Sequence, residues 1–549
     1  MIVIFKNYFI FLLLAFFNGK IFLNYFLNDI KILNKFEQPI IGLIVTAFVA
    51  QLINFFLPLS DILIYLNILI IIIYLLFDFK KIHDLKSLST YISVPIFFLV
   101  LASIYGSSFS DDLNHYHHGS ILNLDANNYI VGSNSLHRMY GFSSLWLILH
   151  SYFNFDYSRL QDIHILNGLI FFLFLSFVSA EIIKEIQNKR ETIYLPILIF
   201  SLLFVLIKYT RLKEFGIDRP AFLIFFYIVL FYIKHIALNF KDNTSDQFKI
   251  SVFFLLSLIS TFLVFTKIIF IFTIFFPLTV FLLIKKKNLI IKNPLFYIFG
   301  LIYISYFIKN FLISGCLVYP VESFCFSKIS WYESETIRNL SFGAEVVNKS
   351  FHQYDGELAD FQYIKNFNWV KTWYSRNYNE LFDFLSLISL IFIITILNFK
   401  KSLATNTNKE KLHFFSLAII FIFSFLLLFL KTPVIRMSHH VFYLLFVIFI
   451  MNYFRERVII INKKAIFLLI LLAFTINFSK NMIRIKKANY INDPIFILKK
   501  SGLYNMAVKN KIENFVYYKG WIGGSPIGNS KLDDYNYKKR FIFDIISKK

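Results

Sequence analysis

One polar segment, residues 107–153, concentrates side chains that could do chemistry. Its ionisable residues are Asp111, Asp112, His115, His117, His118, Asp125, His137 and Arg138. A carboxylate in such a cluster could act as a general base and remove a proton from a hydroxyl acceptor. Asp111 and Asp112 are the candidate bases. In a helical turn, Tyr116 would share a face with Asp112, and His117 would lie one step round and could hydrogen-bond the carboxylate.

Two other interpretations of the cluster stay open. Asp112, His115 and His117 carry oxygen and nitrogen ligands that suit a divalent metal ion, although their spacing matches no established zinc motif. Alternatively, the segment is simply a solvated loop. The sequence predicts no definite cofactor, and a divalent metal is the alternative.

Charged residues elsewhere in apolar surroundings are further candidates. Asp218 opens an apolar run, as a binding residue or as an ordinary acid at a helix start. Lys267 is the lone charge between Ile250 and Ile284. Arg138 and Arg436 are candidate phosphate ligands, because a guanidinium group offers phosphate two parallel hydrogen bonds.

The elements that must position these residues are membrane helices. The chain has 549 residues, of which 57% are hydrophobic and only 16% charged. Its net charge of +23 would suggest a nucleic-acid partner in a soluble protein, but in a polytopic membrane protein such charges belong to the loops, so we predict a lipid bilayer as partner and no nucleic acid. We predict an all-α polytopic membrane protein.

Fourteen apolar runs are candidate transmembrane helices. They fall near residues 1–17, 39–57, 60–77, 91–106, 164–183, 193–208, 220–238, 250–265, 268–284, 295–313, 381–398, 412–430, 439–453 and 464–478. A single helix over residues 250–284 would be about 52 Å long, more than a bilayer core of about 30 Å, so the chain should turn near Lys267.

Basic residues fall in alternate loops, which predicts that those loops are cytoplasmic. The opposite, outer face then carries residues 107–163, 209–219, Lys267, 314–380, 431–438 and the tail from 480. We divide the chain into N-terminal helices over 1–90, a transmembrane core over 91–478 with external loops 107–163 and 314–380, and a small C-terminal extramembrane tail over 480–549, predicted to be periplasmic.

The outer loops carry three more expectations. Residues 140–155 are too short and polar to span, which predicts a helix on the membrane surface. Trp369 and Trp373 should share one face of an interfacial helix. Cys316 and Cys325 would both lie outside, where a disulfide between them is sterically feasible.

Several short segments, each present once, follow one another along the chain in the order found in a known family. They are Asp112 to His117; Gly132, Leu136, His137, Arg138, Ser143 and Ser144; Asp218; Thr266 and Lys267; Ser314, Gly315, Tyr319 and Pro320; Trp331; Pro433 and Arg436. In this order the chain resembles an uncharacterised family of bacterial multi-pass membrane proteins that is similar in architecture to the GT-C glycosyltransferases. The resemblance implies a GT-C-like bundle of about 14 transmembrane helices.

The resemblance also implies a reaction. It points to a membrane glycosyltransferase that transfers a sugar from a polyprenyl-phosphate carrier to a surface glycan or lipid-linked acceptor, at the outer face of the bacterial inner membrane. Asp112, or else Asp111, would be the catalytic base. The substrate-binding candidates are Tyr116, His117, His137, Arg138, Asp218, Lys267, Tyr319 and Arg436. A glycan polymerase or ligase, and a transporter or flippase of lipid-linked glycans, are the alternatives.

Overall fold

The fold is described from a computed structural model of the chain. It describes residues 2–27, 33–78, 88–106, 112–153, 164–188, 192–212, 216–238, 245–403, 410–454, 457–487, 508–512, 515–519, 521–522, 525–526, 535–540 and 542–548. Asp111 lies outside the described residues.

Each of the fourteen predicted apolar runs coincides with a helix. These helices are α1 (Ile2–Phe26), α2 (Glu37–Ile53), α3 (Asp61–Asp78), α4 (Leu88–Tyr105), α7 (Ile165–Gln187), α8 (Tyr194–Lys208), α9 (Asp218–Tyr232), α10 (Asp246–Thr266), η7 (Ile268–Ile274) continuing into α11 (Phe275–Leu283), α13 (Pro294–Ser314), α16 (Trp369–Leu397), α17 (Glu410–Lys431), α18 (His439–Tyr453) and α19 (Lys463–Lys487). Within the described residues, seven helices are long and apolar enough to cross a membrane, and seven shorter apolar helices accompany them. The chain is therefore an all-α membrane protein.

Shorter elements fill the connections. The helical ones are η2 (Leu113–His117), α5 (His118–Ala126), η3 (Ser133–Ser135), η4 (Arg138–Phe142), α6 (Leu145–Tyr152), η6 (Ile233–Ala237), α12 (Asn288–Lys292), η8 (Glu322–Phe324), α14 (Ser334–Asn348), η9 (Phe351–Gln353), α15 (Asp360–Tyr363) and η10 (Ile435–Met437). Four two-stranded antiparallel hairpins pair β1 (Phe399–Leu403) with β2 (Arg457–Ile461), β3 (Val508–Ile512) with β4 (Phe515–Lys519), β5 (Trp521–Ile522) with β6 (Ser525–Pro526), and β7 (Tyr535–Arg540) with β8 (Phe543–Lys548).

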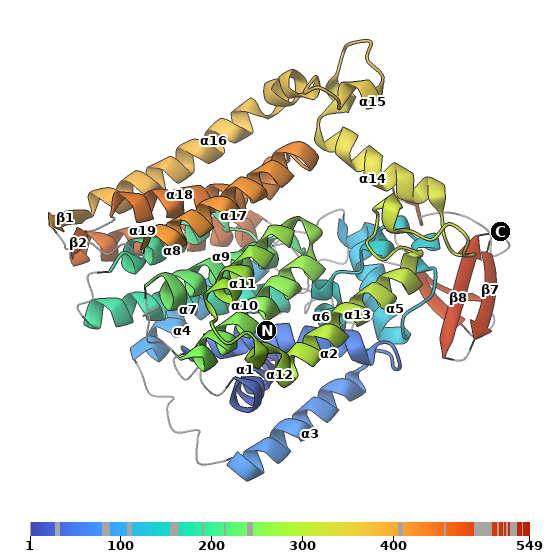
Figure 1. Cartoon of the computed structure of the whole chain (residues 1–549), viewed down its shortest axis with the longest axis horizontal. Coiled ribbons are helices and arrows are strands. Elements are labelled where there is room, and N and C mark those ends of the chain that lie inside the picture. Colours follow the sequence, from blue (N-terminus) through green and yellow to red (C-terminus); the bar gives the residue numbers. More distant parts are fainter. Residues whose placement is uncertain are drawn as a thin grey trace.

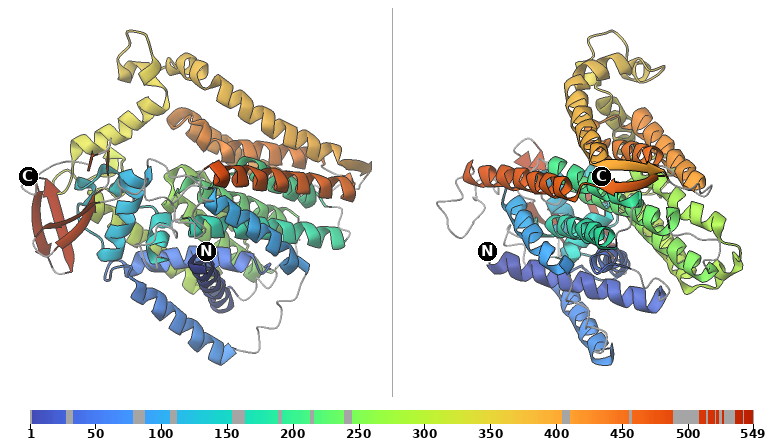
Figure 2. Two further views of the ribbon diagram at one scale, coloured as in Figure 1. Left: turned by 180° about the vertical axis from the view of Figure 1, so that it is seen from behind. Right: turned by 90° about the vertical axis from the view of Figure 1, so that its left-hand side faces the viewer.

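Several of these shorter helices and strands lie at the two ends of the helix bundle (Figure 1). One end holds α5, α14, β7 and β8, and the other holds β1 and β2; Figure 2 shows both ends from behind. The C-terminal hairpin joins the first end directly, because Val131 N donates to Asp544 O and Ile546 N donates to Val131 O, each at 2.9 Å. The described part of the tail thus packs on the loop that precedes η3.

The chain turns at Lys267, as the sequence predicts. Helix α10 ends at Thr266, Lys267 adopts an extended conformation, and α11 returns along α10. One other expectation is wrong, and a second is confirmed in part. Every residue of α6 is buried within the protein, so α6 does not lie on a membrane surface. Trp369 and Trp373 do share one face, but they begin the 29-residue helix α16, and Trp369 is buried.

The polar residues of α6 explain the first error. Trp146 Nε1 donates to Asn167 Oδ1 at 2.8 Å, His150 Nε2 lies 3.4 Å from the same oxygen, and Ser151 Oγ donates to Ile121 O at 3.2 Å. Buried polar groups are tolerated when they find such partners. The polarity of this segment therefore reflects contacts inside the protein.

Helices α1 and α2 pack closely through glycine. A Cβ atom built on Gly42 would lie 1.7 Å from Ala15 O, and one on Gly19 would lie 1.9 Å from Gln38 O. Small residues allow such close approach between membrane helices. Asn18 Nδ2 then donates to Thr46 Oγ1 at 2.9 Å across the same contact.

Gly42→Ile should destabilise the protein by about 2–3 kcal/mol, because overpacking forces the two backbones apart. The measurement is the thermal unfolding midpoint of purified protein in detergent. Gly300→Ile is the matched control, since a Cβ there meets nothing within 4 Å. Equal midpoints for the two variants would contradict the close packing of α1 on α2.

Candidate functional site

Asp112, the predicted base, lies at the start of a short helical turn, at the end of the bundle that holds α5, α14, β7 and β8 (Figure 1). Asp112 immediately precedes η2, whose hydrogen bonds run from residue i to i+5, and it is half-buried. The i+5 pattern is that of a π-helix, a feature often found at functional sites. The ring of Tyr116 contacts the ring of His117 edge-on, with centroids 4.3 Å apart, and stacks parallel to His137 at 6.3 Å. This stacking links the turn that carries Asp112 to the segment that carries Arg138.

His137 and Arg138 sit where the chain enters η4. His137 Nδ1 accepts a hydrogen bond from Met139 N at 3.3 Å and so caps this turn. The side chain of His137 is buried, whereas that of Arg138 is exposed. Burial, together with the nearby charges of Arg138 and His115, lowers the pKa of His137 to about 3. His137 is therefore neutral at physiological pH, and the positive charge of this segment comes from Arg138.

The low pKa of His137 makes stability depend on pH. A histidine in an unfolded chain has a pKa of about 6.5, so between about pH 6.5 and 3 the unfolded state binds the additional proton. The contribution of neutral, buried His137 to the free energy of unfolding is complete above pH 6.5, and it is lost as the pH falls toward 3. His137→Asn can keep the cap through its Oδ1 atom but removes the titration.

We expect the unfolding midpoint to fall less between pH 7 and pH 5 in His137→Asn than in the wild type. The unfolding midpoint of this variant should still depend on pH in part, because burial also lowers the pKa values of His118 and His150, to about 4 and about 3. The matched control is His352→Asn, which removes an exposed imidazole. A slope identical to wild type in His137→Asn would argue against a buried neutral imidazole.

Tyr319 holds the same segment from the loop that follows α13. Its hydroxyl donates to Arg138 O at 2.7 Å, and its ring packs edge-on against Phe142 and directly over Gly141. Burial, with a contribution from Glu333, raises the pKa of Tyr319, so the hydroxyl stays protonated. Tyr319 therefore positions the backbone that presents Arg138.

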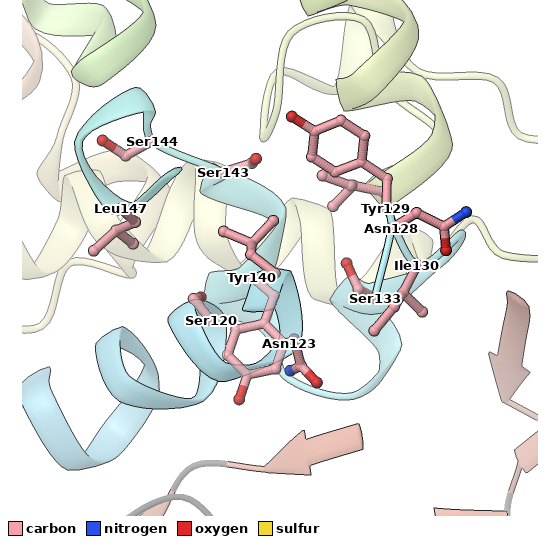
Figure 3. Close-up of a pocket in the computed structure, with 12 residues that line it drawn as sticks. Ser120, Asn123, Asn128, Tyr129, Ile130, Ser133, Tyr140, Ser143, Ser144 and Leu147 are labelled. Atoms are coloured by element: carbon pink, nitrogen blue, oxygen red, sulfur yellow. The ribbon is translucent and has the colours of Figure 1, made fainter. Parts of the chain in front are cut away.

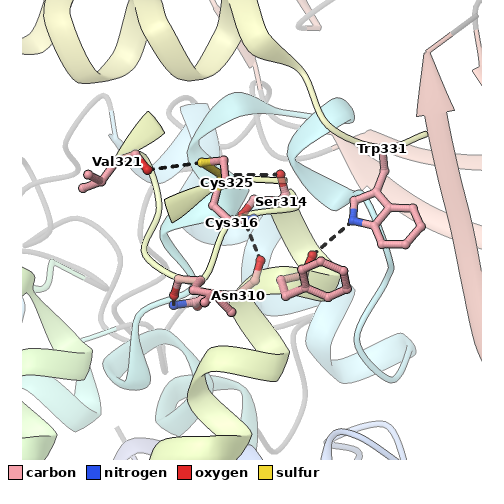
Figure 4. The surroundings of a disulfide bond; sticks show 8 residues. Asn310, Ser314, Cys316, Val321, Cys325 and Trp331 are labelled. Atoms are coloured by element: carbon pink, nitrogen blue, oxygen red, sulfur yellow. Dashed lines mark hydrogen bonds between the residues drawn. A yellow bond between two sulfur atoms is a disulfide. The ribbon is translucent and has the colours of Figure 1, made fainter. Parts of the chain in front are cut away.

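A disulfide between Cys316 and Cys325 closes the loop around Tyr319 (Figure 4). The loop starts at Gly315, which ends α13 in the left-handed conformation with φ +79°, where glycine is favoured. Trp331 Nε1 then donates to Phe311 O at 3.1 Å, and Trp331 lies against Gly132, whose N donates to Leu312 O at 2.8 Å. The motif residues around 132, 315 and 331 thus converge on the end of α13.

A second charged group joins three other loops. Lys267 Nζ forms an ion pair with Asp218 Oδ1 and lies 3.1 Å from Met437 Sδ. Asp218 is in the first turn of α9, and its carboxylate also pairs with Lys267, so helix capping alone does not describe it. Arg436, next to Met437 in η10, is exposed. The loops of residues 209–219, 267 and 431–438 therefore meet, as expected for loops that the sequence predicts on the same side of the bundle.

Ser143 and Ser144 lie between the segment of Arg138 and the ion pair of Lys267 with Asp218. Ser144 Oγ donates to Thr266 O at 3.0 Å, next to Lys267, and Ser143 O accepts from Lys309 Nζ at 2.8 Å. Both serines line an open pocket that also includes Tyr129, Tyr140 and Ile313 (Figure 3). The segment that begins at Arg138 thus runs from the Asp112 turn to the Lys267 pair along this pocket.

Residues 1–443 match the family described as a domain of unknown function (DUF8201). The chain belongs to this family. No curated protein and no solved structure matches the chain. The family region contains every candidate residue from Asp112 to Arg436, whereas β7 and β8 lie beyond it.

A metal site in this DUF8201 protein would need several ligands in one place. Within the ranges that the structure describes, no three His, Cys, Asp or Glu side chains are close enough to hold a metal ion. The structure thus does not assemble Asp112, His115 and His117 as a ligand set.

Sequence reasoning missed Lys309 and the pocket. Lys309 is the only charge between Leu295 and Ile313, the same signal that singled out Lys267, and that signal could have found it. The pocket residues Ser120, Asn123 and Tyr129 are ordinary in type and spacing, and only the fold brings them together.

Proposed function

We propose that this protein is a membrane glycosyltransferase with a GT-C-like bundle of about 14 transmembrane helices. It would take a sugar from a polyprenyl-phosphate carrier and pass it to a surface glycan or lipid-linked acceptor at the outer, periplasmic face of the bacterial inner membrane. The resemblance of the sequence to a family with GT-C-like architecture suggests this reaction. Because a shared architecture does not establish an activity, the supporting evidence must come from the site.

The observation that carries the proposal is the meeting of five separate loops at one end of the bundle. Tyr319 binds the backbone of Arg138, Ser144 binds that of Thr266, and Lys267 joins Asp218 to Met437. Carboxylates, cations and an open pocket lie together where membrane helices end. Such an arrangement suits a substrate with a lipid tail, a phosphate and a sugar.

The chemistry needs one base and positive charge. Asp112 takes the proton of an acceptor hydroxyl, the acceptor oxygen forms a bond to the anomeric carbon of the sugar, and the bond from that carbon to the carrier phosphate breaks. The phosphate leaves with the bonding electrons and needs no proton. Arg138, Lys267 and Arg436 supply the positive charge that stabilises it.

The Cys316–Cys325 disulfide supports the outer placement of this end. Disulfides persist in oxidising compartments and are rare in the cytosol. Because the loop with the disulfide binds Arg138, the whole cluster shares its compartment.

The charges buried at the opposite end do not favour a transporter. Lys234 Nζ lies 3.4 Å from Glu37 and 3.1 Å from Glu181, all three being buried. Glu37 starts α2, and Lys234 follows the end of α9, so this group lies toward one end of the helices. Transporters place such charges near the middle of the bilayer.

The test is turnover. Purified protein in lipid nanodiscs is incubated with polyprenyl-phosphosugars and a glycan acceptor, and release of polyprenyl phosphate is measured. We expect release with at least one donor. Release of polyprenyl pyrophosphate from oligosaccharide donors instead would identify a polymerase or ligase, and no turnover with either donor class would count against both enzymes.

A further inference from the structure

The C-terminal hairpin of β7 and β8 is built into the candidate site. Val131, which precedes η3, forms backbone hydrogen bonds to β8, accepting from Ile546 N and donating to Asp544 O. Gly132 lets the two backbones come this close, because a Cβ atom on it would lie 2.1 Å from Ile546 O. The hairpin is therefore fixed to the backbone that leads into η3 and η4.

The side chain of Ile546 is the apolar anchor of the hairpin and is fully buried. It shares a small cluster with three residues of the site segment, Ile130, Leu136 and Tyr140, and the ring of Tyr116 packs against this cluster. The cluster is separate from the large core of the helix bundle. The packing of the bundle therefore does not depend on Ile546.

The same cluster encloses His137. Leu136 directly precedes it, and the centroids of the Tyr140 and His137 rings lie 5.2 Å apart. The ring of Tyr116 stacks parallel to His137 at 6.3 Å. Because Ile546 packs on the residues that surround His137, the hairpin contributes to the burial of this imidazole.

Other strands of the tail lie beside the neighbouring turn. Strand β5 lies beside η2, the turn that Asp112 precedes, and β4 lies beside α5. All these strands lie beyond residues 1–443, the region that matches the family. Part of the cover over the segment of His137 and Arg138 is thus supplied from outside the family region.

We propose that the C-terminal hairpin positions residues 131–140 for the reaction, and that Ile546 is the positioning residue through which it acts. Tyr319 holds the backbone of this segment at Arg138 O, and Ile546 holds its apolar side chains. Both contacts are needed for Arg138 to keep its place in the site. The inference rests on the proposed function, because it assigns a role in that reaction, but the burial of His137 can be measured without turnover.

The test replaces Ile546 with aspartate in the full-length protein in lipid nanodiscs. A carboxylate is costly in an apolar contact, so Ile546→Asp should release β8 from the segment. The accessibility of His137 is measured by acylation of its imidazole with diethyl pyrocarbonate and mass spectrometry of the peptides. We expect its labelling to rise about 10-fold, because local opening exposes a buried group to the reagent. Release of polyprenyl phosphate should fall about 10- to 100-fold, the scale on which misplaced groups slow a reaction.

Two matched variants separate positioning from general damage. Ile546→Leu keeps the apolar volume and should restore both the protection of His137 and the rate of transfer. Ile542→Asp makes the same chemical change at a side chain that is 44% exposed, and it should behave as the wild type does. Labelling of His352, an exposed imidazole, serves as the internal reference and should be equal in all variants.

Wild-type labelling of His137 in Ile546→Asp would overturn the inference, because the hairpin would then not enclose this segment. A rise in labelling with an unchanged rate of transfer would also overturn it, because the hairpin would cover the segment without positioning it. If the wild type itself releases no lipid phosphate, the labelling still decides whether Ile546 holds His137 in place, and only the transferase proposal fails.

Discussion

Asp112→Asn is expected to lower glycan transfer about 100-fold or more, the usual scale for loss of a general base. Asparagine keeps the size of the side chain and loses only the ability to accept the proton. Asp112 is half-buried at the start of η2, so the protein should remain as abundant in the membrane as the wild type. The measurement is the rate of polyprenyl phosphate release, normalised to the amount of folded protein.

Three comparisons make this result decisive. Asp111→Asn should have a smaller effect, and Asp355→Asn, an exposed carboxylate in another loop, should have none. Full activity in Asp112→Asn with loss in Asp111→Asn would move the base to Asp111. Full activity in both would make the cluster an ordinary solvated loop. Activity that is lost to a chelator and restored by a divalent ion would instead make Asp112, His115 and His117 ligands.

The helices could be predicted from sequence because the bilayer fixes their length and excludes charge. A charge inside an apolar run that is too long for one span therefore predicted the break at Lys267. The alternation of basic loops predicted that residues 209–219, Lys267 and 431–438 lie on one side of the bundle. The contacts of Lys267 with Asp218 and Met437 confirm that these loops meet.

The errors have one physical origin. Sequence shows how polar a segment is, but not whether lipid, water or protein surrounds it. Helix α6 can be buried because Asn167 of the following helix α7 provides the hydrogen-bond acceptor for Trp146 and lies beside His150. Trp369 is buried because Lys349 and Phe429 cover its ring.

The site was predicted in part for the same reason. Asp218 and Lys267 could be singled out because a charge beside apolar residues is costly, but their pairing depends on the packing of α9 against α10. The pocket could not be predicted, because serines and tyrosines are common and each gains its role only from its neighbours in space.

Lys267→Gln is expected to lower transfer about 100- to 1000-fold, the range seen when a group that stabilises developing charge is removed. The side chains of Lys267 and Asp218 are 28% and 34% exposed, so water can solvate the partner that is left, and the protein should still fold. Asp218→Asn should cost less, about 10-fold, because Asp218 orients the ammonium group and does not itself face the phosphate. Transfer rates of both single variants and the double variant form a complete thermodynamic cycle.

The double variant decides between positioning and independent action. If Asp218 acts through Lys267, the Asp218→Asn substitution adds nothing once Lys267 is glutamine, so the double variant transfers as slowly as Lys267→Gln alone. Multiplicative losses would show that Asp218 contributes separately, for example as a second base, and would remove it from the role of positioning residue. The matched control is the ion pair between Lys431, whose side chain is 68% exposed, and Glu345, whose side chain is 15% exposed; their charged atoms lie 2.9 Å apart. Lys431→Gln removes the same charge and should leave transfer unchanged, because only the Lys267 pair adjoins the pocket through Thr266 and Ser144.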